Sequence, residues 1–138
     1  MFIKAREEKV LRTGDCVYAR THTEFLNKTF DANLKGFMRT VWYYKSGVYV
    51  WMVRFDGVEH DGWKNVFIDK NTIKETYRGG SGEPMRYAEA KTRIVIEIQE
   101  GYAGRKYIFK GLFKVDEKNT DGYTVRIHKK ISDEFRYY

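Results

Sequence analysis

Short runs of β-branched and aromatic residues, each ended by a turn signal, fill most of this chain of 138 residues. The clearest pair is 38–44 and 48–55, with only Lys45-Ser46-Gly47 between them, which is typical of a β-hairpin. Further strands are predicted at 16–20, 58–63, 64–69 or 73–77, 93–99, 106–115 and 123–131. Short strands in this number close or cover the edges of their sheet. The pattern therefore predicts an all-β fold, a small and strongly bent β-barrel, with minor α content of one or two turns within 21–35.

The strongest break in this pattern is a Gly-rich loop at 79–84, which ends on the single proline of the chain. A short helix is expected directly after it, over 85–91, because Glu83-Pro84 favours a first helical turn. Neither the charge balance nor the composition changes across the loop. We therefore expect residues 1–138 to form a single domain that contains this loop.

The charge and the cysteine content restrict the partners and the compartment. Lysine and arginine number 26 against 19 acidic residues, a formal net charge of +7, which favours polyanionic ligands. The single cysteine excludes a disulfide scaffold. No apolar run approaches the roughly 20 residues of a membrane span, and the first residues are charged rather than apolar. The expectation is a soluble, cytoplasmic protein with no membrane partner.

The last two predicted strands carry a pattern of basic residues. Alternate side chains of a strand face opposite sides of a sheet. We expect the core to receive the apolar sides, which hold Tyr107, Phe109, Gly111, Phe113 and Val115 in one strand and Tyr123, Val125, Ile127 and Ile131 in the other. The opposite sides would then expose a set of basic residues with no acidic one among them: Lys106, Lys110, Lys114, Arg126, His128 and Lys130.

Like charges that face one another on paired strands destabilise a sheet, so this basic face calls for a ligand. The phosphates of a nucleic acid would neutralise it, and we predict that it binds them. In the alternative interpretation, the lysines only discourage edge-to-edge pairing of exposed strands.

Aromatic residues concentrate around the first hairpin, at Trp42, Tyr43, Tyr44, Tyr49, Trp51, Phe55 and Trp63. Both faces of this hairpin are largely apolar, so most of these rings are expected in the core. Tyr44 and Trp63 lie next to turn signals, where a ring can reach the surface. These two are predicted to line an aromatic pocket on which a base stacks.

The motifs of nucleophilic catalysis are absent, since there is no Gly-x-Ser-x-Gly and no histidine is placed to activate Cys16. The acidic stretch 56–63 is interpreted as two Asp-Gly turns rather than a metal site, because it lacks a second histidine or a cysteine. We predict no catalytic residue, no metal and no cofactor. The alternative is a metal-dependent nuclease, in which Glu97 holds Mg²⁺ together with Asp69 or Asp56.

Two parts of the chain resemble a known superfamily. Gly14-Asp15-Cys16-Val17, and 104–115 with the strand that follows it, are similar to the Gly-Asp turn and the core strands of PUA-like β-barrels. SRA and EVE members of that superfamily read modified bases and often accompany restriction systems, so the resemblance implies a base-reading domain. Separately, 47–55 with Asp56-Gly57 resembles the bent strand and turn of Tudor-like barrels, which use an aromatic cage for protein ligands.

Together these features predict a PUA-like domain that binds a nucleic acid or a nucleotide without catalysing a reaction. It would use the basic hairpin face and the aromatic pocket, and the resemblance implies that it reads a modified base. The alternative is a protein-protein interaction module or a small inhibitor, with the aromatic hairpin as its contact surface for a protein partner.

Overall fold

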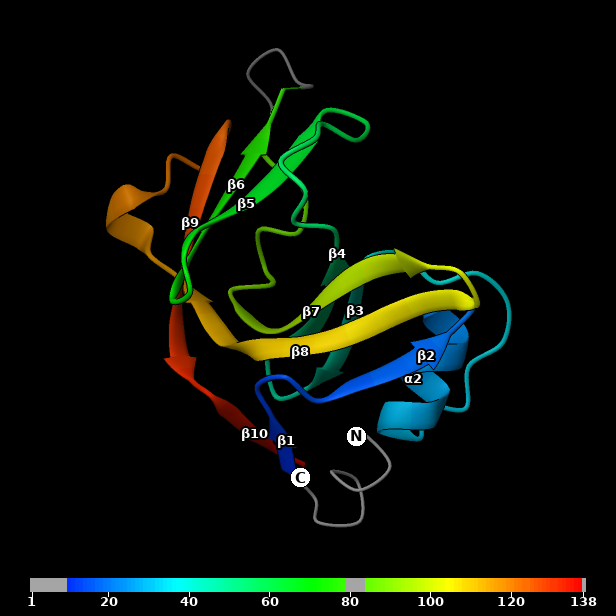
Figure 1. Cartoon of the computed structure of the whole chain (residues 1–138). Helices are drawn as coiled ribbons and strands as arrows, with labels where there is room; N and C mark the ends of the chain where they lie inside the picture. Colours follow the sequence, from blue (N-terminus) through cyan, green and yellow to red (C-terminus); the bar gives the residue numbers. More distant parts are fainter. Residues whose placement is uncertain (1–9, 79–83, 138) are drawn as a thin grey trace.

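Strands dominate the computed structural model, which describes residues 10–78 and 84–137 (Figure 1). They are β1 Val10–Arg12, β2 Cys16–Ala19, β3 Val41–Lys45, β4 Val48–Val53, β5 Trp63–Asp69, β6 Thr72–Tyr77, β7 Thr92–Gly101, β8 Gly104–Val115, β9 Val125–Ser132 and β10 Glu134–Arg136. One α-helix, α2, spans His22–Phe30, and a short 3-10 helix spans Glu117–Asn119. The large sheet follows the order β3-β4-β7-β8-β9-β6-β5, and β2 also pairs with β8. A second sheet joins β1 to β10.

The prediction of an all-β fold is confirmed, although the large sheet is bent rather than closed into a barrel. Its two ends, β3 and β5, do not pair with each other in the described structure. Most of the predicted Gly-rich loop, residues 79–83, lies outside the described residues. No helix within 10–78 or 84–137 is long and apolar enough to cross a membrane.

Two local predictions are wrong. The tract 58–62 is irregular and ends in a turn before β5 instead of forming a strand, and 85–91 contains turns instead of a helix. In the second tract Tyr87 has a left-handed φ of 64°, which interrupts a helix. The buried guanidinium of Arg93 also donates hydrogen bonds to two backbone carbonyl oxygens of this tract, Ala90 O at 2.6 Å and Tyr87 O at 3.3 Å.

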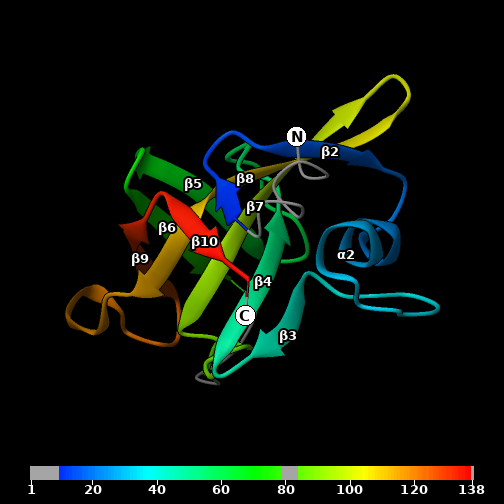
Figure 2. The ribbon, with the colours of Figure 1, turned by 90° about the horizontal axis from the view of Figure 1, so that it is seen from below.

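Two hydrophobic cores cover the two faces of β4 and β7. In the first core, Phe25 and Leu26 of α2 pack on the side chains of Val50 and Ile96. Figure 2 shows α2 and the β1–β10 pair on this side of the sheet. The second core holds Trp51, Val53, Ile73, Val95 and Phe113, and it lies on the side of β6. Both faces of β4 are therefore buried, as its apolar composition predicted, whereas Tyr43 of its partner strand β3 is 52% exposed.

The long strand β8 exchanges its faces at a β-bulge. Phe109 pairs with Ile96 and Gly111 pairs with Val95, so Lys110 is an extra residue between the two pairs. Gly111 has a φ of 132°, and a Cβ at this position would lie only 2.9 Å from the Lys130 side chain. The bulge turns Phe113 into the second core, whereas Phe109 lies in the first.

The strand β9 has the opposite orientation to the one predicted. Arg126 and His128 are buried, whereas Tyr123 and Ile131, expected in the core, are more than half exposed. Glu75 of the neighbouring strand β6 supplies the compensating charge inside the fold. The alternation of side chains along one strand does not show which face has an oppositely charged residue on a neighbouring strand. The prediction of which face enters the core failed for this reason.

Candidate functional site

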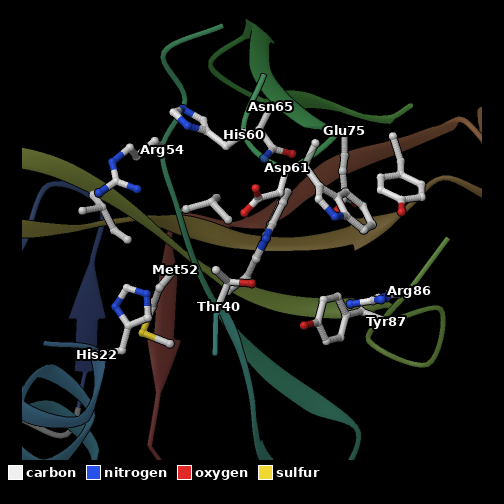
Figure 3. A pocket seen from close by; sticks show the side chains of 15 residues that line it. His22, Thr40, Met52, Arg54, His60, Asp61, Asn65, Glu75, Arg86 and Tyr87 are labelled. Atoms are coloured by element: carbon white, nitrogen blue, oxygen red, sulfur yellow. The ribbon is translucent and has the colours of Figure 1, made fainter. Parts of the chain in front are cut away.

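A cavity of about 470 Å³ lies between the end of β4, the strands β5 and β6, and the tract that follows residue 84 (Figure 3). Its walls combine aromatic rings, arginines and a few uncharged or acidic polar groups. This volume falls in the range of about 300–1,000 Å³ that is typical of ligand pockets.

Aromatic rings form one wall of this cavity. Trp63 at the start of β5 pairs with Tyr77 at the end of β6, and their ring centroids are 4.4 Å apart. Trp51 and Tyr87 also line the cavity. The structure thus places Trp63, one of the two predicted pocket residues, in a wall that a planar ligand can contact.

Tyr44, the other predicted pocket residue, does not lie in this cavity. Its ring packs against Phe30 (centroids 5.6 Å apart) and Phe135 (5.5 Å), which places it in the first core. The register of β3 shifts between Tyr43 and Lys45. The expectation that Tyr44 and Trp63 share one pocket is therefore corrected: a ring beside a turn can be covered by an element from elsewhere in the chain.

A buried ion cluster centred on Glu75 lies behind the aromatic wall. The Glu75 Oε1 atom accepts hydrogen bonds from Arg126 Nε (2.9 Å) and His128 Nε2 (2.9 Å), and Oε2 accepts one from Arg126 Nη2 (3.1 Å). The Nη1 atom of Arg93 lies 3.5 Å from Oε1. All four side chains are almost completely buried, so each depends on the others for its polar partners.

This cluster also supports the tryptophans. The guanidinium of Arg93 lies 4.5 Å from the centroid of the Trp51 ring, and that of Arg126 lies 5.8 Å from the Trp63 ring. Contacts between a cation and an aromatic face contribute about 0.5–2 kcal/mol each. Glu75 holds both arginines, and the arginines in turn help to position the two rings.

The charges of the cluster do not cancel. Burial works to raise the pKa of Glu75, but the charge of Arg93 and the hydrogen bonds from His128 and Arg126 outweigh it. The pKa of this carboxyl therefore lies well below its usual value, and Glu75 is ionised. Burial lowers the pKa of His128, so its imidazole is neutral at neutral pH. One carboxylate thus faces two guanidinium groups, which leaves one net positive charge behind the wall.

A two-residue turn brings an acidic side chain to the cavity. Asp61 and Gly62 have φ values of 52° and 88°, and backbone hydrogen bonds of 2.7 and 2.9 Å between His60 and Trp63 close the turn. Asp-Gly suits this geometry because both residues take a positive φ. The interpretation as an Asp-Gly turn is confirmed for Asp61-Gly62, and this turn places Asp61 among the residues that line the cavity.

Two polar side chains of the cavity keep unused hydrogen-bonding capacity. Asn65 is only 9% exposed, and its Oδ1 has no hydrogen-bond partner among the described residues. Asp61 makes no ion pair within the described parts of the chain. Both side chains line the cavity, as labelled in Figure 3. A buried amide without a partner is costly, so Asn65 is suited to pair with a bound molecule.

The three predicted lysines of β8 do not share one surface. Lys106 and Lys110 lie on the side of the second core, and the Lys110 Nζ atom is 5.4 Å from the ring of Phe67. The bulge places Lys114 on the other side of the sheet, which it shares with Leu112. The continuous row of cations expected from strict alternation is therefore divided between two faces.

The predicted basic residues of β9 are already paired. Arg126 and His128 are buried against Glu75, as described above. The side chain of Lys130 is 10% exposed, and its Nζ atom bonds Asp133 at 2.9 Å. Because these cations are covered or neutralised, the expectation of an exposed basic hairpin face is corrected. Lys106 and Lys114 are the members of this set that have no carboxylate partner in the described parts of the chain.

Two of the carboxylates considered for a metal site pair with basic side chains. Glu97 lies 3.5 Å from Lys110, and Asp56 lies 3.0 Å from His60. Within residues 10–78 and 84–137, no group of three or more His, Cys, Asp or Glu side chains could hold a metal ion.

Sequence reasoning missed Asp61, Asn65 and Glu75 as residues of this site. A local signal existed for Asn65, because it lies two positions after Trp63 in a strand and so shares its face. No local signal exists for Glu75, whose partners are 18 to 53 positions away in the chain.

Comparison of the whole sequence with known families gives one decisive result. A sequence model of the SRA domain, the SET and RING associated domain, matches residues 4–137. The chain belongs to the SRA family. SRA domains bind DNA and read modified cytosine. Membership confirms both the predicted PUA-like superfamily and the predicted class of function, nucleic-acid binding with recognition of a modified base.

A solved structure with a similar fold is that of the 5-hydroxymethylcytosine-specific restriction enzyme AbaSI, at a TM-score of 0.79 and 18% sequence identity. The match covers 99% of this SRA chain but 45% of the enzyme chain, so the chain spans less than half of that enzyme. At this identity the likeness shows a shared fold. A comparison with curated proteins gives no significant match.

Proposed function

We propose that the cavity receives a modified cytosine that is turned out of a DNA duplex. The observation that carries this proposal is the combination of the Trp63 ring with the uncommitted polar groups of Asp61 and Asn65 in one cavity. A base inside a duplex cannot reach such groups, so recognition of this kind requires the base to leave the stack. The specificity stated in the name of AbaSI makes 5-hydroxymethylcytosine the first ligand to test.

Each group has a distinct task in this proposal. The Trp63 ring offers a stacking surface. The carboxylate of Asp61 only accepts hydrogen bonds, so it suits the exocyclic amino group of cytosine and opposes the carbonyl oxygen that thymine carries at the same position. The amide of Asn65 both donates and accepts, which allows it to bind the rest of the base edge or a hydroxyl on the substituent.

The size of the cavity also favours a substituted base. At about 470 Å³ it is larger than a single pyrimidine ring requires. Space therefore exists for a group on the C5 atom of cytosine.

The direct test compares duplexes that differ at one cytosine only, which is unmodified, 5-methylated or 5-hydroxymethylated. We expect the modified duplexes to bind more tightly, and fluorescence anisotropy at one fixed salt concentration measures this. Equal affinity for all three duplexes would contradict the proposal.

Replacement of Asn65 by alanine tests the base edge. We expect Asn65→Ala to reduce the preference for the modified duplex by about tenfold or more, because one hydrogen-bonded base contact contributes about 1–3 kcal/mol to discrimination. Affinity for unmodified DNA should change little. The matched control is Asn119→Ala, at an exposed asparagine of the 3-10 helix, outside the cavity. An unchanged preference in Asn65→Ala, with the fold intact by circular dichroism, would remove Asn65 from the recognition site.

A further inference from the structure

A second charged cluster lies at one end of the cavity and involves the hairpin between β7 and β8. Arg54 lines the cavity, and its Nη2 atom donates a hydrogen bond to Glu100 Oε1. The Nε atom of Arg105 lies 3.3 Å from the same oxygen. In Figure 3, Arg54 and His22 lie at the end of the cavity away from Arg86 and Tyr87.

This cluster is open to solvent and unbalanced in charge. The two arginine side chains are about one-third exposed, and that of Glu100 is 57% exposed. One carboxylate oxygen thus holds two guanidinium groups, which leaves one net positive charge. Ion pairs with this exposure are weak, so another anion can take the place of the carboxylate. A guanidinium fork binds phosphate as well as it binds a carboxylate.

The positive charge of this cluster also affects the pKa of His22, which lines the same end of the cavity. Its pKa is lowered to about 4, first by burial and then by the charges of Arg105 and Arg54. The Nδ1 atom of His22 is 2.9 Å from the hydroxyl of Tyr107, which fixes the ring. The imidazole is therefore neutral at neutral pH, and the positive charge at this end of the cavity belongs to the two arginines.

The hairpin is accessible to a large ligand. Glu100 and Arg105 face each other across β7 and β8, just before the turn that holds Tyr102. Tyr102 is fully exposed, and Figure 2 shows this hairpin projecting beyond the rest of the sheet. A DNA backbone that runs past the cavity can therefore reach both arginines.

We propose that Arg54 and Arg105 bind a backbone phosphate beside the nucleotide whose base enters the cavity, and that Glu100 occupies the position of this phosphate in the DNA-free protein. This inference rests on the proposed function, because the base in the cavity determines where the backbone lies. Glu100 then competes with DNA: its carboxylate orders the arginines in advance but must leave them when the phosphate binds.

The test is the variant Glu100→Gln, which removes the competing charge and keeps the size of the side chain. We expect about three- to tenfold tighter binding at low salt, for modified and unmodified duplexes alike. The matched control is Glu117→Gln, at an exposed glutamate whose 2.9 Å ion pair with Lys91 lies outside the cavity. Unchanged or weaker binding by Glu100→Gln would overturn the inference. An equal increase in DNA affinity for Glu100→Gln and Glu117→Gln would also overturn the inference, because it would reflect only the change in net charge.

The arginines themselves provide a second readout. Arg54→Gln and Arg105→Gln should each weaken binding, and the double variant should reduce the slope of log affinity against log salt by about one, as expected for the loss of one phosphate contact. An unchanged slope in the double variant would overturn the inference. The proposed function is judged separately, by the ratio of affinities for modified and unmodified duplexes, which Glu100→Gln should leave unchanged.

Discussion

Replacing Trp63 with alanine should weaken binding to a duplex that carries a modified cytosine by about ten- to hundredfold. The reason is that stacking of one base on an aromatic side chain contributes about 1–3 kcal/mol. Trp63 lines the cavity with one part of its surface and contacts Tyr77 with another. Fluorescence anisotropy with the same duplexes, with and without the modification, measures the loss.

Two further variants separate stacking from general effects. Trp63→Phe keeps an aromatic face and should retain most of the affinity. Tyr123→Ala removes a half-exposed ring outside the cavity and should have little effect. A Trp63→Ala protein that loses the same affinity for modified and unmodified DNA would show that the ring does not read an extruded base. Thermal unfolding confirms that each variant is folded.

The strands could be predicted because their signals are local. The hairpin of β3 and β4 follows from two apolar runs around a short turn, and the burial of β4 on both faces follows from the absence of a polar side. The Asp-Gly turns before β5 follow from residues that accept a positive φ. Trp63, which lines the cavity, was predicted as a pocket residue because it directly follows one of these turns.

The basic face could not be predicted, because two non-local features reverse it. A single extra residue, Lys110, changes which side of the sheet the rest of β8 faces; the adjacent Gly111 is typical of a bulge, but which residue is extra is decided by the pairing with β7. In β9 the charged side faces inward because Glu75 of β6 offers a partner to Arg126 and His128. Both features depend on neighbouring strands that one sequence does not identify.

The cavity could not be predicted from the sequence for the same reason. Its wall, its polar groups and its arginines come from separate strands and turns that only the bent sheet brings together. Arg54 and Arg105, which we assign to phosphate binding, come from the residue after β4 and from the start of β8, and they meet through Glu100. A search for rows of lysine along one strand could not detect such a site.

The variant with the largest expected effect on stability is Glu75→Gln. Glutamine keeps the shape of the side chain but removes the negative charge that faces Arg93 and Arg126 in the interior. Breaking a buried ion pair in this way costs about 3–5 kcal/mol, because a charge is left without compensation. Urea denaturation should show a loss of this size in the free energy of unfolding. Glu117→Gln, which breaks an exposed pair, should cost less than about 1 kcal/mol.

The Glu75 cluster also gives the stability a defined dependence on pH. The pKa of Glu75 is held below the value of 4.5 for a free glutamate, so its stabilising effect is complete above pH 4.5 and is lost as the pH falls through the lower folded pKa. The pKa of His128 is lowered from 6.5, so below pH 6.5 the unfolded chain binds a proton that the folded protein does not, and stability begins to fall. Glu75→Gln loses the first effect and increases the second, because Glu75 works to raise the pKa of His128. Thermal unfolding from neutral to acid pH should therefore show the difference between wild type and variant narrowing below pH 4.5. A difference that stays constant there would show that Glu75 does not owe its stabilising effect to its charge.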